Sequence, residues 1–167
     1  MRELISIIRA IALRIRYSRR QLDRKLSVAA IAGHTRLVDS LIAAGADIHA
    51  NSAEALRWAA MAGHHGVVRT LIRAGADIHA WNDAALRAAA MLGHLAVVRE
   101  LIRAGARFRA NRDQALNEAA TSGNLSIVTE LLDATADRNA PTMEEDMAAM
   151  RVFLRAAALQ RKQHRDG

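Results

Sequence analysis

The sequence predicts an all-α fold, a solenoid of stacked helical repeats, and three features carry this prediction. Segments of 30 residues recur without gaps between residues 21 and 140. Hydrophobic residues make up 51% of the chain but aromatic residues only 3%, so the apolar content is mostly small or aliphatic and suits closely packed helices. Glycines recur at fixed positions in these segments, as they do where helices end. A fixed period of this length is typical of repeat proteins.

The two central segments are the most alike, NSAEALRWAAMAGHHGVVRTLIRAGADIHA and WNDAALRAAAMLGHLAVVRELIRAGARFRA, and a weaker copy flanks them on each side. The 167 residues have room for one domain. We divide it into an N-terminal cap helix, four repeats, a C-terminal cap helix and a tail, at residues 1–20, 21–50, 51–80, 81–110, 111–140, 141–163 and 164–167.

Each repeat has the pattern of two antiparallel helices and a loop. A polar residue that can cap a helix stands near its start, at Asp23, Ser52, Asp83 and Asp113. Glycine recurs between the two helices, at Gly33, Gly63, Gly93 and Gly123. The second helix carries apolar residues on one side, as at Val67, Val68, Leu71 and Ile72.

The shared string AALRxAAxxGHxxVVxxLIxAGADIHA resembles the ankyrin repeat over about residues 21 to 140. The usual unit of that family has about 33 residues and a T-P-L-H start, whereas each unit here is shorter and lacks Thr-Pro. The missing residues fall between Ala80 and Leu86, so we expect the projecting hairpin of the family to be reduced to a tight loop. The resemblance implies a protein-binding scaffold that uses a concave face made of first helices and loops.

The N-terminal segment reads as a half-repeat cap. Two periods before the apolar residues Val67, Val68 and Leu71 of a second helix lie Ile7, Ile8 and Ile11, so the cap helix continues that register. Its predicted apolar side, which we expect to pack on the stack, consists of Leu4, Ile8, Ile11 and Ile15. At the other end Pro141 opens a longer cap helix, in which Met147, Met150 and Leu154 are expected to cover the last repeat.

The net charge of +7 is concentrated at the N-terminus. Residues 1–25 carry +6, residues 26–140 are neutral and residues 141–167 carry +1. The alternative function is therefore an N-terminal helix that contacts nucleic acid or an anionic membrane through Arg2, Arg9, Arg16 and Arg20. No stretch of about 18 uncharged apolar residues occurs, and we expect a soluble protein of the cytoplasm.

Catalytic chemistry finds no support in the sequence. There is no cysteine, and neither a phosphate-binding loop nor a metalloprotease or hydrolase motif occurs. His34, His64 and His94 recur once per repeat, but packed helices lie about 8–10 Å apart and Zn–N bonds are near 2 Å. Structural roles for these histidines are therefore favoured. We predict a protein that is not an enzyme and has no cofactor, no metal and no small-molecule substrate.

The predicted binding surface lies on the first helices, at the two positions after each Ala-Ala pair, where exposed apolar side chains indicate a partner. Trp81 is expected beside this surface, and arginines at its edge. The predicted partner-binding residues are Ile31, Arg57, Met61, Trp81, Arg87, Met91, Leu92, Arg109 and Arg112. The alternative is that the methionines are buried within the protein. Trp58 is expected in the core, and the outer arginines are expected to be balanced by Asp77 and Glu100.

The partner is thus expected to be another protein, one with an apolar and partly acidic patch. Arginine outnumbers lysine 22 to 2, which points to a GC-rich genome and to a bacterium or its phage. In such settings the family resemblance implies an inhibitor, an effector or an adaptor.

Overall fold

The computed structural model describes residues 2–50, 53–106 and 112–136, together with residues 151, 152, 154 and 158. Nine helices and no strand occur in these residues, so the all-α prediction is confirmed. The helices are α1 (Arg2–Arg16), α2 (Arg19–Ile31), α3 (Thr35–Ala43), α4 (Glu54–Met61), α5 (His65–Arg73), α6 (Ala80–Leu92), α7 (Leu95–Arg103), α8 (Arg112–Thr121) and α9 (Leu125–Ala136).

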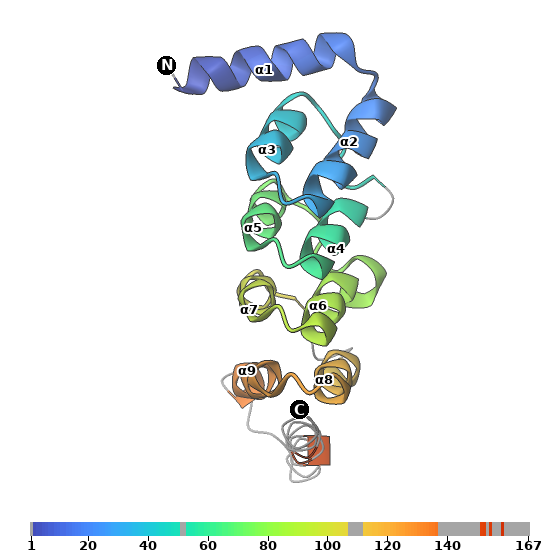
Figure 1. Cartoon of the computed structure of the whole chain (residues 1–167), viewed down its shortest axis with the longest axis vertical. Helices are drawn as coiled ribbons and strands as arrows, with labels where there is room; N and C mark the ends of the chain where they lie inside the picture. The colour runs from blue at the N-terminus through green and yellow to red at the C-terminus, as the bar shows by residue number, and fades with distance from the viewer. Residues whose placement is uncertain are drawn as a thin grey trace, which may run out of the picture.

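The helices form two parallel rows (Figure 1). An inner row consists of α2, α4, α6 and α8, each in contact with the next, and an outer row of α3, α5, α7 and α9 does the same. Each inner helix also packs on the outer helix that follows it in the chain. This is the predicted helical repeat solenoid.

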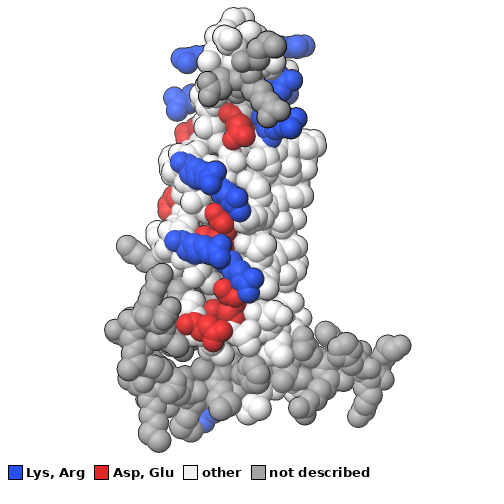
Figure 2. All heavy atoms as spheres, turned by 90° about the vertical axis from the view of Figure 1, so that its left-hand side faces the viewer, with Lys and Arg blue, Asp and Glu red and all other residues white. Residues whose placement is uncertain are grey.

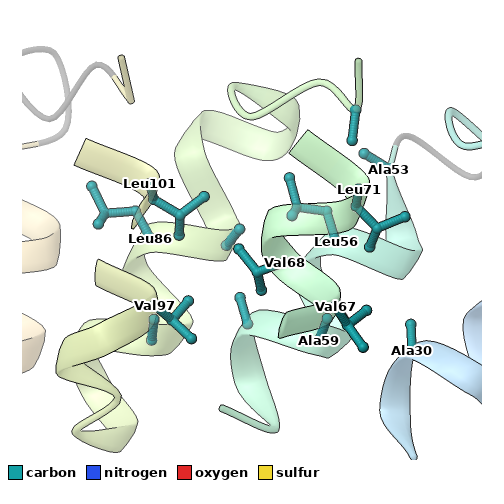
Figure 3. Close-up of a cluster of buried hydrophobic side chains, with 14 of the residues drawn as sticks. Ala30, Ala53, Leu56, Ala59, Val67, Val68, Leu71, Leu86, Val97 and Leu101 are labelled. Carbon is teal, nitrogen blue, oxygen red and sulfur yellow. The ribbon is translucent and has the colours of Figure 1, made fainter. Parts of the chain in front are cut away.

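The core runs between the two rows, and Figure 3 shows its central part. Val67, Val68 and Leu71 of α5 are fully buried, and Leu56 and Ala59 of α4 are at most 1% exposed. Full burial of a Val or Leu side chain stabilises a fold by about 1.5–3 kcal/mol. Because the same positions recur every 30 residues, each helix pair extends one continuous core.

The predicted cap at Asp23 is wrong, because α2 begins earlier than the repeat pattern indicates. Ser18 precedes this helix, and its amide donates to Oε1 of Gln21 at 2.9 Å. Asp23 therefore lies inside α2, where its carboxylate accepts a hydrogen bond from the amide of Asp47 at 2.7 Å. The residue fastens the loop after α3 instead of starting a helix. Ser52 and the side chain of Asp113 lie outside the described residues.

The predicted orientation of the N-terminal cap is also wrong. α1 crosses the end of the stack and contacts α3 and α2 (Figure 1). The residues on the core side are Ala10 and Leu13 of α1 and Tyr17, which follows the helix. The four side chains expected to pack are instead 53–82% exposed: Leu4, Ile8, Ile11 and Ile15.

Little of the predicted C-terminal cap helix, 141–163, falls within the described residues. Residues 151, 152, 154 and 158 are helical, and Val152 packs against the core. Leu154, expected to cover the last repeat, is 60% exposed. Met147 and Met150 lie outside the described residues, as does the tail, 164–167.

Candidate interaction surface

Three predicted binding residues occupy the same position on successive inner helices. Ile31 ends α2, Met61 ends α4 and Met91 is the last but one residue of α6. Because α2 contacts α4 and α4 contacts α6, these positions follow one another along the inner row. Ile31 is 46% exposed, Met91 44% and its neighbour Leu92 46%, while Met61 is half-buried. We call Ile31, Met61, Met91 and Leu92 the apolar row.

The exposed apolar residues begin earlier on α2 than expected, and the equivalent positions of the last inner helix are polar. Val28 lies one turn before Ile31 and is 65% exposed. The sequence interpretation missed it, because only the two positions after each Ala-Ala pair were considered. On α8 the corresponding residues are Thr121 and Ser122, both exposed. The apolar surface is therefore confined to α2, α4 and α6.

Hydrogen bonds from the following unit hold the backbone of the apolar row. Nε2 of His64 lies 2.8 Å from the carbonyl oxygen of Ile31, and Nε2 of His94 lies 3.0 Å from that of Met61. Since a carbonyl oxygen only accepts, each Nε2 carries the hydrogen. Nδ2 of Asn124 donates to the carbonyl of Met91 at 2.9 Å. The structural role favoured for the repeated histidines thus has a defined geometry at these two positions.

Glycine is required beside each of these histidine rings. Gly33 has φ +73°, in the left-handed region, and a Cβ there would lie 2.6 Å from Nδ1 of His64. Gly63 has φ +75°, and its Cβ would lie 2.7 Å from the ring of His94. The Gly-His pair therefore lets consecutive units approach closely and fixes the spacing of the apolar row.

The predicted arginines lie one turn before the methionines. Arg57 precedes Met61 by four residues and Arg87 precedes Met91 by four, a spacing that puts each pair on one helix face. Both arginines are half-buried. Nη1 of Arg87 donates to Oε1 of Gln114 at 2.7 Å, while its Nε is buried with no hydrogen-bond partner in the described part of the chain.

The prediction that Trp58 lies in the core is wrong. It is half-buried, its Nε1 donates to Oε1 of Glu54 at 2.9 Å, and Cζ of Arg57 lies 4.6 Å from its ring centroid. This arrangement is a cation–π contact on the inner-helix face. The tryptophan thus contacts one of the arginines that the sequence predicts to bind a partner.

In place of the expected tight loop, a left-handed turn lies at the start of α6. Trp81, Asn82 and Asp83 have φ values of 54°, 56° and 51°, a conformation that costs roughly 1–2 kcal/mol per residue with a side chain. Oδ1 of Asp83, whose residue is 3% exposed, lies 2.9 Å from Nδ1 of His79. This bond closes the turn and leaves Trp81 67% exposed.

The prediction that Trp81 lies beside the apolar row is wrong. It lies in the left-handed turn at the start of α6 and Met91 lies near the end, so the regular helical residues that follow Asp83 separate the two. Trp81 instead lines a hollow of about 470 Å³ with loop residues that include His49 and Asp77. The inner-helix face thus carries two separate candidate contacts.

The remaining predicted residues are two partner-binding arginines and the four arginines expected to contact an anionic surface. Arg109 lies outside the described residues, as does the side chain of Arg112. Arg9, Arg16 and Arg20 are exposed at the N-terminal end of the stack, and the side chain of Arg2 is not described.

On the outer row, Figure 2 shows basic and acidic side chains following one another along the stack. Arg69 lies 3.5 Å and His65 3.1 Å from Glu100, and Arg99 lies 2.8 Å from Glu130. The expected balancing role is confirmed for Glu100 but not for Asp77, whose Oδ1 accepts a hydrogen bond from the amide of His79. These pairs neutralise much of the outer basic stripe.

The described residues hold no group of three or more His, Cys, Asp or Glu side chains placed to bind a metal ion. No helix within the described ranges has the length and apolar character needed to cross a bilayer.

Comparison with known families agrees with this architecture. A model of ankyrin repeats in three copies matches residues 75–142, and a single ankyrin repeat model matches residues 55–83. No curated protein matches the chain. Ankyrin repeats are generally protein–protein interaction modules, and proteins made of them are typically not enzymes. The matches together span residues 55–142, more than half of the 167 residues, and the chain belongs to the ankyrin repeat family.

Proposed function

We propose that this protein binds another protein through the apolar row together with Arg57 and Arg87. The observation that carries the proposal is the exposure, at 44–46%, of Ile31 on α2 and of Met91 and Leu92 on α6, on either side of the half-buried Met61 of α4. Contiguous exposed apolar side chains on a folded protein are typical of a binding surface. Methionine adapts its shape to a partner more readily than branched side chains do.

The partner surface that fits is apolar with an acidic edge. The two arginines flank the methionines on the same helix faces, and a carboxylate would meet either guanidinium with charge-assisted hydrogen bonds. Arg87 is the stronger candidate to bind such a carboxylate. Its Nε has no partner among the described residues, and a buried unsatisfied donor costs about 1–3 kcal/mol. A carboxylate that draws the guanidinium outward would satisfy it.

The rigid placement of the row supports binding without rearrangement. The carbonyl groups of Ile31, Met61 and Met91 are each held by a side chain of the next unit. A preformed surface loses less conformational freedom on binding than a mobile one. Trp81, at the loop end of α6, would provide a second contact to a partner that extends along this helix from Met91.

The role that we propose is non-catalytic, that of a cytoplasmic inhibitor, effector or adaptor in a bacterium or phage. The family's general use in protein interaction supports the interaction role, and the arginine-rich composition supports the source. The partner would be identified by affinity capture from the native host followed by mass spectrometry.

The test compares two matched variants in that capture experiment and in titration of the captured partner. Met91→Glu places a charge in the apolar row, whereas Leu37→Glu places one on α3 at a residue of similar exposure, 41% against 44%. We expect Met91→Glu to weaken the complex at least tenfold and Leu37→Glu to leave it unchanged. Equal binding by wild type and Met91→Glu would refute the proposed surface, provided that both have the same melting temperature.

A further inference from the structure

The helix α1 exposes a long row of aliphatic side chains. Each is 50–82% exposed, and they are Leu4, Ile5, Ile7, Ile8, Ile11 and Ile15. Leaving so much apolar surface in water on one helix of 15 residues is unfavourable unless something covers it. This surface lies at the N-terminal end of the stack, on a different element from the apolar row.

The exposed face points away from the stack. Ala10, 7% exposed, and the partly buried Leu13 and Tyr17 form the side of α1 that packs on the core. Successive residues are about 100° apart around a helix, so Ile8 and Ile15 point in roughly the opposite direction from Leu13. α1 therefore has two apolar sides, one that packs on the core and one that is largely exposed, which we call the free side.

Arginines border the free side. By the same geometry Arg9 and Arg16 lie along one edge of it and Arg14 along the other. All three are exposed, and no carboxylate among the described side chains lies within ion-pair distance of them. Two arginines of the outer row differ, since Arg69 and Arg99 have carboxylate partners.

We propose that α1 lies in the surface of an anionic lipid bilayer, with its free aliphatic side in the boundary between headgroups and acyl chains. A helix with one apolar side and arginines along its edges has the pattern of an interfacial amphipathic helix. The arginines contact the anionic headgroups, whose charge they complement. The segment of residues 1–25 carries +6, so its charge favours an anionic surface as a whole.

A second copy of the chain is a poorer occupant of the same face. Two α1 helices packed through their aliphatic sides would bring Arg9, Arg14 and Arg16 of both copies close together, and like charges in contact repel. Nucleic acid is also a poorer fit, because aliphatic side chains do not stack on bases. Tyr17, the aromatic residue next to this helix, faces Lys25, whose Nζ lies 4.4 Å from its ring centroid.

The position of α1 determines how the stack would be oriented on the bilayer. The helix runs across the end of both rows, as Figure 1 shows. A bilayer that takes up its outward side would hold the stack end-on, with the inner row extending away from the lipid. The apolar row would then remain accessible to a protein partner.

The first experiment measures binding of the full chain to vesicles by co-sedimentation. Vesicles of phosphatidylcholine alone are compared with vesicles of phosphatidylcholine mixed with phosphatidylglycerol. We expect binding to the anionic vesicles only, weakened by added salt. Arg9→Gln and Arg16→Gln should each weaken it by roughly fivefold, while Arg103→Gln, an equal charge change at an exposed residue of α7, should have no effect.

Aliphatic contact is tested at the most exposed position, Ile15, 82% exposed. Ile15→Asp should weaken vesicle binding at least tenfold, whereas Ile15→Leu should retain it. Because the side chain is in solvent, both variants should fold like the wild type by circular dichroism. If Ile15→Asp bound vesicles as the wild type does, the proposal would be wrong.

A second measurement does not depend on loss of binding. The chain has no cysteine, so Ile11→Cys and Arg103→Cys each give one site for a polarity-sensitive fluorophore. On addition of anionic vesicles, the label on α1 should shift to shorter wavelength and the label on α7 should not. An unshifted label at position 11 would overturn the proposal. So would binding of an oligonucleotide, or dimerisation that Ile15→Asp abolishes, without any binding to vesicles.

Discussion

Helices α1 and α5 carry similar residues at equivalent positions of the 30-residue period, yet the structure places them oppositely. Val67, Val68 and Leu71 of α5 are fully buried, whereas Ile7, Ile8 and Ile11 of α1 are 53–61% exposed. α5 packs on α4 and lies between α3 and α7, while α1 makes its main contacts with α3 and α2. The burial of an apolar position in a repeat protein is thus decided by its neighbours as much as by its place in the period.

The largest test of this difference is truncation of matched aliphatic residues. Leu71→Ala should lower the free energy of unfolding by about 2–5 kcal/mol, because it opens a cavity in the core. Ile11→Ala, at the equivalent position of α1, should change it by at most about 0.5 kcal/mol. Urea denaturation followed by circular dichroism measures both. Similar losses for the two variants would mean that α1 is packed like α5.

A smaller effect is expected at the glycine that precedes α5. Gly63→Ala forces a left-handed residue with a Cβ, at about 1–2 kcal/mol, and also brings that Cβ to 2.7 Å from the ring of His94. Gly45→Ala has the same backbone problem, with φ +94°, but no atom within 4 Å of its Cβ. Thermal melting should therefore rank Gly63→Ala below Gly45→Ala. An equal loss would show that the His94 ring moves aside without cost.

The smallest effect separates an interior histidine from the one at the end of the stack. His94→Ala removes the hydrogen bond to the carbonyl of Met61 and should cost about 1 kcal/mol. His34 is exposed and has no hydrogen bond from its ring in the described structure, so His34→Ala should cost less than about 0.5 kcal/mol. Chemical denaturation of the two variants side by side tests the pair, and a larger loss for His34→Ala would contradict it.

The fold could be predicted because the same apolar and glycine positions recur in successive repeats. Equivalent positions are occupied by Leu56 and Leu86, and by Val67 and Val97, and all four side chains are at most 1% exposed. A wrong assignment in one repeat is therefore corrected by comparison with the others. The cap helix has no second copy. Its leucine and isoleucines face outward because Ala10, Leu13 and Tyr17 take the contacts with the stack, and periodicity does not distinguish these two sides.

The candidate surface was predicted less completely for a related reason. The positions of Ile31, Met61 and Met91 follow from the repeat, and their exposure agrees with a surface role. The position of Trp81 does not follow from the repeat, because no sequence pattern predicts three consecutive left-handed residues without glycine. Trp58 was assigned to the core from its size, and its contacts with Glu54 and Arg57 depend on side-chain geometry.

The Gly-His contact between consecutive units also bears on how the gene can change. His64 meets Gly33 and Ile31 in the same way that His94 meets Gly63 and Met61. A tandem duplication of one 30-residue block in the coding sequence would therefore give every new residue a neighbour of the type it already has. Repeated duplication of such a block would add one methionine at a time to the proposed binding surface.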